Sequence, residues 1–157
     1  MREILFRGKR IDNGEWVQGF YMHHSNVAHY IIDIQYGGYE DIDGGFFVPR
    51  WYAVNPNTIG EYTGLTDKNG KRIFEGDVLE YNDGYDYFKG EVVFEAGSFG
   101  MGTYETIGIP NSRCDNYISL WDLFWGQKAT DELEIYYCEV IGNIHNNSEL
   151  LKGENNV

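Results

Sequence analysis

The chain has 157 residues and a formal net charge of -13, which comes from 25 acidic and 12 basic side chains. Hydrophobic residues make up 42% and aromatic residues 17% of it, which excludes a disordered or low-complexity chain. The longest uninterrupted apolar runs, Trp51 to Val54 and Ile135 to Cys138, are much shorter than the roughly 20 residues of a membrane-spanning helix.

The first third of the chain predicts antiparallel strands. Asp12-Asn13-Gly14 is a strong hairpin turn, because Asn and Gly tolerate positive φ. In the aromatic-rich segment that follows, a two-residue period places Trp16, Phe20 and Met22 on one face. Pro49 indicates an edge strand or a bulge. The strands expected here are residues 4–7, 15–22, 28–35 and 46–54.

The rest of the chain continues as short strands between glycine-rich turns. The expected strands are residues 58–65, 71–74, 76–81, 88–94, 99–106 and 132–144. Residues 119–125 are compatible with either a strand or a short helix. We therefore predict an all-β protein, in which residues 71–144 form a small, strongly bent, SH3-like barrel packed with the N-terminal antiparallel strands.

Composition offers one division of the chain, at Asn55-Pro56-Asn57. We predict N-terminal hairpins and a sheet over residues 1–55, a second region over 56–151, and a frayed tail over 152–157. The two regions could still form one compact domain.

The N-terminal segment has neither the apolar core nor the small-residue cleavage site of a signal peptide. We therefore expect the protein to stay in the cytoplasm. Cys114 and Cys138 are then expected to be two free, packed thiols, since a reducing compartment disfavours disulfides.

The acidic charge is concentrated towards the C-terminus, where residues 91–157 have 3 basic and 11 acidic side chains. Nucleic-acid binding usually needs a basic stripe, and only Arg2, Arg7, Lys9 and Arg10 cluster. A nucleic-acid partner is therefore disfavoured. The acidic half fits a solvated surface best, with a docking face for a basic partner or a mimic of nucleic-acid charge as alternatives.

Asp67, Glu75 and Asp77 are the candidate catalytic or metal-binding carboxylates. Two acids two residues apart on a strand share one face and could hold a metal or divide acid and base roles. The structural alternative, which we favour, is that these acids accept backbone N–H groups in turns. The run that starts at Asp67 is not a calcium loop, because its Gly70 stands at the fourth position and no Glu follows at the twelfth.

The four histidines offer little support for a metal or catalytic site. His24 and His29 have a ligand-like spacing, but no Cys-x-x-Cys pair accompanies them. Ser25 with His29, and Cys114 with His145, are nucleophile–base pairs by residue type, without a nucleophile-elbow pattern around them. We assign no catalytic, cofactor-binding or metal-binding residue.

The chain is rich in aromatic side chains, with 13 Tyr, 9 Phe and 4 Trp. Most of these rings should pack in the core and on strand faces. The surplus, especially Trp51-Tyr52 and residues 121–125, predicts a subunit interface, because aromatic residues are enriched at interfaces.

Three segments resemble the YopX family, which comprises small proteins encoded by phages and prophages of bacteria. Residues 59–79 (IGEYTGLTDKNGKRIFEGDVL) are similar to its signature block, residues 1–8 to its N-terminal strand, and residues 139–145 with 148–151 to its C-terminal block. Residues 20–50 and 98–132 match no signature. The resemblance implies a mainly β protein of phage origin that works in the bacterial cytoplasm, and it implies no catalytic residue.

We therefore predict a non-enzymatic phage or prophage accessory protein that binds a host or phage macromolecule, and that forms a homo-oligomer without a cofactor. Two alternatives come from other classes. One is a metal-assisted hydrolase that uses Asp67, Glu75 or Asp77. The other is a nucleic-acid-facing protein, which is either a binder through the N-terminal basic cluster or an acidic DNA mimic.

Overall fold

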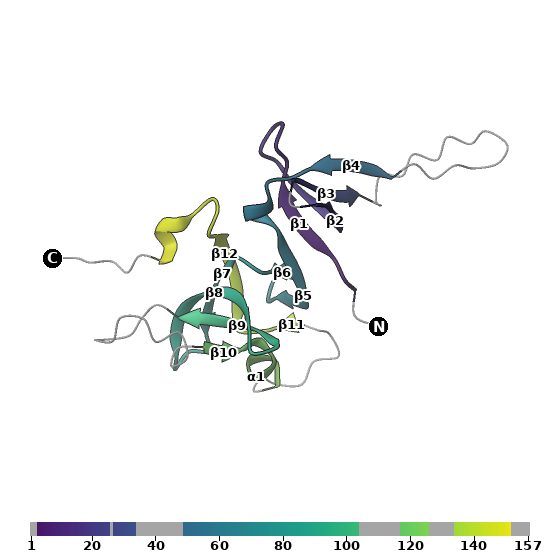
Figure 1. The fold of residues 1–157 in the computed structure, drawn as a ribbon. Coiled ribbons are helices and arrows are strands. Elements are labelled where there is room, and N and C mark those ends of the chain that lie inside the picture. The colour runs from purple at the N-terminus through teal and green to yellow at the C-terminus, as the bar shows by residue number, and fades with distance from the viewer. Residues whose placement is uncertain (1–2, 26, 34–48, 104–116, 126–133, 152–157) are drawn as a thin grey trace. The chain divides into compact units, whose positions relative to one another are not determined.

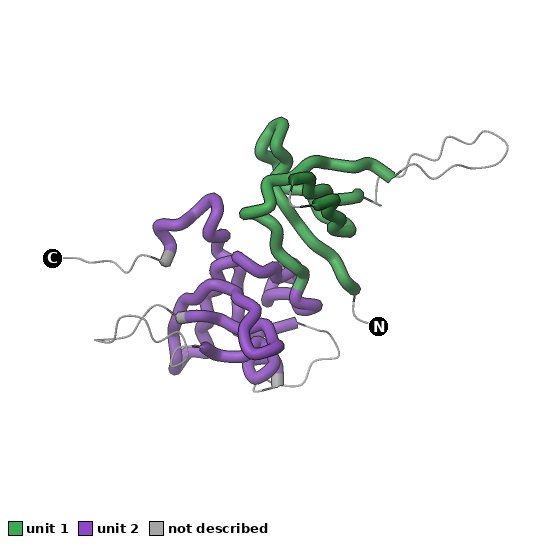
Figure 2. Tube along the Cα trace, in the orientation of Figure 1, with its two compact units in different colours: residues 1–62 green, residues 63–157 purple. Residues whose placement is uncertain are grey.

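A computed structural model describes residues 3–25, 27–33, 49–103, 117–125 and 134–151 of the chain, and strands dominate them (Figure 1). The prediction of an all-β protein is confirmed. The chain divides into two compact units, residues 1–62 and 63–157 (Figure 2). The elements are β1 (Phe6–Lys9), β2 (Trp16–His24), β3 (Ala28–Asp33), β4 (Arg50–Ala53), the 3-10 helix η1 (Pro56–Thr58), β5 (Gly60–Asp67), β6 (Arg72–Phe74), β7 (Asp77–Asn82), β8 (Tyr87–Glu95), β9 (Ser98–Thr103), β10 (Tyr117–Ser119), the helix α1 (Leu120–Trp125), β11 (Glu134–Ile135), β12 (Cys138–Asn143) and the 3-10 helix η2 (Ser148–Leu151).

Unit 1 is an antiparallel arrangement in which β1, β2, β3 and β4 pair in chain order. The predicted turn between β1 and β2 is present, with Gly14 at a φ of 73°. The chain after β4 returns to β1, since the N–H of Asn55 donates to the carbonyl of Lys9 at 2.8 Å. Ile31 and Val54 are fully buried and form the centre of this unit.

The segment that composition marks as a division is a capped turn within unit 1. The side chain of Asn55 accepts a hydrogen bond from the N–H of Asn57 at 3.0 Å, at the start of η1. The side chain of Thr58 in turn accepts one from the N–H of Lys9 at 2.9 Å. The predicted division at residues 55–57 stays a prediction.

The chain passes from unit 1 into unit 2 along β5. The start of β5 pairs with β1 in unit 1, through Gly60 and Glu61. Its end pairs with β6 and, in parallel, with β11. The second sheet has the order β10-β9-β8-β7-β12. The buried core of unit 2 draws on both sheets and α1, and consists of Leu65, Ile73, Leu79, Val92, Phe99, Met101, Leu120, Ile135, Cys138 and Val140.

The predicted barrel over residues 71–144 is wrong, because this sheet does not close among the described residues. Its path ends at β10 and β12, which pair with β9 and β7 respectively and not with each other. The edge of β12 that faces away from β7 forms a hydrogen bond to the turn after β5, since the N–H of Lys68 donates to the carbonyl of Cys138 at 2.9 Å. A strand whose edge is already occupied in this way cannot complete a barrel.

Two further expectations are settled in unit 2. Residues 119–125 are mainly helical, as α1, and Leu120 is buried in the core. The predicted strand 132–144 is wrong as one strand, because the chain turns at Tyr136 and Tyr137 between β11 and β12. The reason is a change of partner, from β5 for β11 to β7 for β12. Residues 104–116, 126–133 and 152–157, with Cys114 and the predicted tail, lie outside the described residues.

Helices in the described part of the chain are all too short or too polar to cross a lipid bilayer.

Candidate functional site

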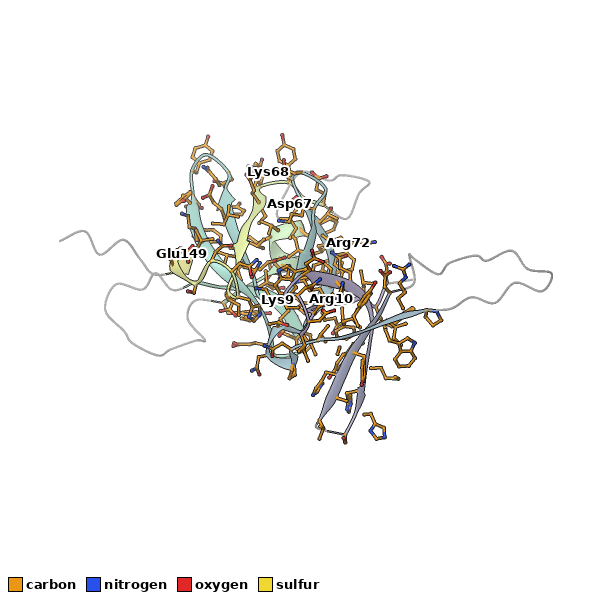
Figure 3. All side chains as sticks on the ribbon, turned by 90° about the horizontal axis from the view of Figure 1, so that it is seen from above. Lys9, Arg10, Asp67, Lys68, Arg72 and Glu149 are labelled. Atoms are coloured by element: carbon orange, nitrogen blue, oxygen red, sulfur yellow. The ribbon has the colours of Figure 1, made fainter. Side chains whose placement is uncertain are left out.

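Asp67 ends β5 (Figure 3). It is one of two enclosed candidate carboxylates, with 1% of its surface exposed. Its Oδ1 accepts hydrogen bonds from the N–H groups of Asn69 and Lys71, both at 2.9 Å. This is the Asx-turn chemistry that favours Asp before a tight turn. Gly70 completes the turn at a φ of 75°.

The other carboxylate oxygen of Asp67 links the turn to a strand far away in the sequence. Oδ2 accepts a hydrogen bond from the N–H of Val140 at 2.9 Å, across 73 positions of the chain. Val140 lies on β12 and is buried, so this N–H would otherwise be without water or a ladder partner on that side. An ion pair between Lys68 and Glu139 lies beside it.

The thiol of Cys138 lies at the start of β12 and is fully buried. Burial raises the pKa of this thiol to about 12, and the nearby negative charge of Asp67 acts in the same direction. A thiol that stays protonated is a poor nucleophile, so Cys138 is a packing residue. The prediction of a free, packed thiol is confirmed for Cys138.

Asp77 serves the next turn in the same manner. It is 1% exposed, and its Oδ2 accepts a hydrogen bond from the N–H of Phe74 at 2.8 Å. Gly76 supplies the bend at a φ of 81°. Gly76 also ties this turn to the end of β12, because its carbonyl accepts the N–H of Ile144 at 2.9 Å.

Two of the three candidate carboxylates therefore bind backbone N–H groups. Asp67 and Asp77 each accept N–H groups of their own turns, as the structural alternative predicts. Glu75 lies between them in the sequence, and its side chain is half-buried. The described residues contain no group of three His, Cys, Asp or Glu side chains placed to hold a metal ion. The hydrolase alternative gains no support from this arrangement.

The histidine that lies opposite His29 is His23, and not His24, which the sequence spacing suggests. His29 lies directly opposite His23 on β2, whereas His24 lies opposite Ala28 and so on the other face of the sheet. Strand parity thus separates His24 from His29. The hydroxyl of Ser25 donates to the carbonyl of His24 at 2.5 Å. The Ser25–His29 pair has no geometric support, and Cys114 lies outside the described residues.

The described members of the N-terminal basic cluster contact rings and acids of unit 1. The guanidinium of Arg7 lies 4.7 Å from the ring centre of Trp16, and Arg7 is buried. Arg10 donates to both carboxylate oxygens of Asp12, at 2.9 and 2.5 Å, and lies over the ring of Tyr52. Lys9 also lies over the ring of Trp16, at 5.5 Å, so all three described cations are engaged within the chain, which weakens the case for a phosphate-binding stripe.

Over β2, β3 and β4, one face of the sheet in unit 1 is apolar and open to solvent. Direct pairing places Phe20, Ile32 and Trp51 in one cross-strand row. A neighbouring row has Met22, Tyr30 and Ala53, and the ring of Tyr30 meets that of Trp51 edge-on at 6.1 Å. Phe20 is 49%, Met22 38% and Trp51 50% exposed. We call these six residues the aromatic face.

The structure groups these aromatic residues differently from the sequence, and the subunit interface predicted from them stays a prediction. Trp51 belongs to the aromatic face, while Tyr52 points to the opposite, half-buried face. Phe20 and Met22 join it because β2, β3 and β4 are neighbours, which their positions in sequence do not reveal. In unit 2, Trp121 is exposed on α1 and stacks on Phe124 at 5.5 Å.

Comparisons with known proteins agree with the fold. The sequence model of the YopX family, described as YopX protein, matches residues 5–152. The crystal structure of protein EF1440 from Enterococcus faecalis superposes with a TM-score of 0.51 over 96% of this chain and 99% of that chain. The two sequences are 22% identical, so the likeness concerns the fold alone. A comparison with curated proteins finds no match.

Proposed function

This chain belongs to the YopX family, and on that premise we propose that it is a phage or prophage accessory protein that binds another protein in the bacterial cytoplasm and catalyses no reaction. The aromatic face is the observation that supports this proposal. Interfaces are enriched in Trp, Tyr, Phe and Met and depleted of charge at their centre. The aromatic face has these residues and no charged one.

The chemistry of the aromatic face indicates a protein surface as its partner. A nucleic acid would require free cations along the face to replace phosphate counterions, but the two cations on this side of the sheet, Arg7 and Lys9 of β1, lie against the ring of Trp16. An apolar partner surface gains from the exclusion of water at about 25 cal/mol per Å² of apolar area. The proposal includes a homo-oligomer, in which the partner of the aromatic face is a second copy of the chain.

Light scattering after size-exclusion chromatography at micromolar concentration tests self-association. We expect a species heavier than the 18.1 kDa monomer for the wild-type chain. Trp51→Ser should shift it to the monomer, because it removes a large apolar contact. Tyr85→Ser is the matched control, since Tyr85 is 97% exposed in a turn of unit 2.

Affinity capture from a host lysate tests a partner other than a second copy. A specific partner should be retained by the wild-type chain and by Tyr85→Ser, and lost with Trp51→Ser and with Phe20→Ser. Capture that all four chains share, together with a monomer at every concentration, would contradict the proposed role of the aromatic face.

A further inference from the structure

We propose that His23 and His29 form a two-histidine site for a divalent transition-metal ion on the face of the β2–β3 hairpin opposite the aromatic face. The two residues are directly paired across the antiparallel strands. Directly opposite side chains project to the same side of a sheet, with their Cβ atoms about 4.5–5.5 Å apart. This brings two imidazoles together without any loop.

The distance between the rings fits one shared ion. The ring centres of His23 and His29 are 6.1 Å apart and their planes are 27° from parallel, so a turn of the exposed His23 ring is needed to aim a nitrogen of each ring at the same ion. With metal–nitrogen bonds of about 2.1 Å, two imidazoles on one ion have ring centres roughly 5 to 6.5 Å apart, depending on the angle at the metal. The observed spacing lies within that range. His23 is exposed, so an ion can reach the pair from solvent.

Tyr21 supplies the orienting contact that metal-binding histidines usually have. Its hydroxyl lies 2.6 Å from Nδ1 of His29, and the two rings are nearly parallel with their centres 6.0 Å apart. When Nδ1 of His29 donates to the phenol oxygen, Nε2 carries the lone pair that binds a metal. The same Tyr21 ring stacks on His23 at 5.8 Å, so it holds both imidazoles.

The ligand set selects the class of ion. Imidazole nitrogens suit Zn²⁺, Ni²⁺ and Cu²⁺, and Cu²⁺ binds a given nitrogen site most tightly. Two protein ligands leave the other coordination positions to water. The site is therefore exchangeable, unlike the closed four-ligand sites that contribute to folding. Bound metal would bridge β2 and β3 and stiffen the hairpin that also presents the aromatic face.

Calorimetric titration of the full chain with NiCl₂ and with CuCl₂ tests the site. We expect one site for each chain, with a lower dissociation constant for Cu²⁺ than for Ni²⁺. His23→Ala should weaken Ni²⁺ binding by at least about 10-fold, because it removes one of two ligands. His23 is exposed, so this variant should keep the fold, which its urea midpoint without metal verifies.

Three further variants separate this site from adventitious binding. His24→Ala is the matched control, since His24 is the neighbouring histidine on the opposite face, and its Ni²⁺ affinity should equal that of the wild-type chain. His29→Gln should lose binding as His23→Ala does. Tyr21→Phe should weaken binding roughly 10-fold through the lost contact to Nδ1. Equal Ni²⁺ affinity of the His23→Ala, His24→Ala and wild-type chains would overturn the proposal, as would the absence of Ni²⁺ binding by the wild-type chain.

Discussion

Unit 1 and unit 2 are both built mainly from antiparallel strands, and both have buried charged residues and exposed aromatic ones. The carboxylate turns of unit 2 nevertheless contrast with the aromatic face of unit 1. In unit 2 two carboxylates, Asp67 and Asp77, are enclosed and bound to backbone N–H groups. In unit 1 the large apolar residues Phe20 and Trp51 remain in solvent. Enclosed polar groups with satisfied bonds specify a fold, whereas exposed aromatic groups are available to a partner.

The three segments that resemble the YopX family form paired strands of the fold and no part of the aromatic face. The signature block contributes β5, β6 and part of β7, and the C-terminal block contributes most of β12. β7 and β12 are paired strands. The N-terminal block includes the start of β1, which pairs with the start of β5. These segments pair with one another, and all six residues of the aromatic face lie outside them.

The largest expected effect is on the sheet of unit 1. A Cβ atom at Gly19 would lie 1.9 Å from the carbonyl oxygen of Ile32, so Gly19→Ala must displace backbone between β2 and β3. We expect a loss of about 3 kcal/mol in the free energy of unfolding, measured with urea.

Gly102→Ala is the matched control for Gly19→Ala. A Cβ atom at Gly102 on β9 would have no neighbour nearer than 3.8 Å, which is ordinary contact. Its urea midpoint should stay close to that of the wild-type chain. A Gly19→Ala chain as stable as Gly102→Ala would show that β2 and β3 do not approach as described.

The next effect concerns alkaline pH. Burial raises the pKa of Cys138 to about 12, and burial together with the Asp83 contact raises that of Tyr81 to about 12. The unfolded chain releases these protons near the ordinary values of 9.0 and 10.0, while the folded chain retains them. Stability is therefore complete below about pH 9 and falls as pH rises towards 12.

Urea unfolding between pH 7 and pH 11 measures this slope, with Cys138→Ala as the informative variant. That variant should be less stable at pH 7, because it leaves a cavity, but its stability should decline less steeply above pH 9. An identical decline in the two chains would contradict the account of the buried thiol.

The smallest effect is expected at the ion pair between Lys68 and Glu139, which joins the same two segments as Asp67 does. Both side chains are about 40% exposed, at 43% and 39%, so water and salt screen their attraction. Lys68→Ala should therefore leave the urea midpoint nearly unchanged. A large loss of stability would mean that charge pairing holds the β5–β6 turn against β12.

Turns and the alternation of side chains along a strand were predictable from the sequence, because both depend on interactions between neighbouring residues. The turns at Gly14 and Gly70 follow from a positive φ that glycine tolerates, and both were predicted. The alternation along β2 also correctly separated Phe20 and Met22 from Tyr21. These features depend on a few adjacent residues.

Features that depend on distant pairing were missed for a common reason. The division of residues 132–144 follows from a change of partner strand, which alternation within the segment does not encode. His23 lies opposite His29 because of the register of β2 and β3, whereas the sequence spacing indicated His24 as the partner of His29. The bond from Val140 to Asp67 spans 73 positions, and nothing near either residue indicates it.

The central claim is that the signature carboxylate Asp67 stabilises the fold through its bond to β12, and urea unfolding of Asp67→Asn tests it most directly. Asparagine keeps an oxygen for the N–H groups of Asn69 and Lys71 but presents an NH₂ group to the N–H of Val140. Asp83→Asn is the matched control, because Oδ1 of Asp83 accepts two turn N–H groups at 2.8 and 2.7 Å on an exposed loop.

We expect Asp67→Asn to lower the free energy of unfolding by about 2 kcal/mol, the typical cost of a buried N–H left without an acceptor. Asp83→Asn should change it much less, because its turn bonds survive and no buried strand depends on them. Equal stability of the Asp67→Asn and wild-type chains would contradict the claim and would reopen a chemical role for this carboxylate.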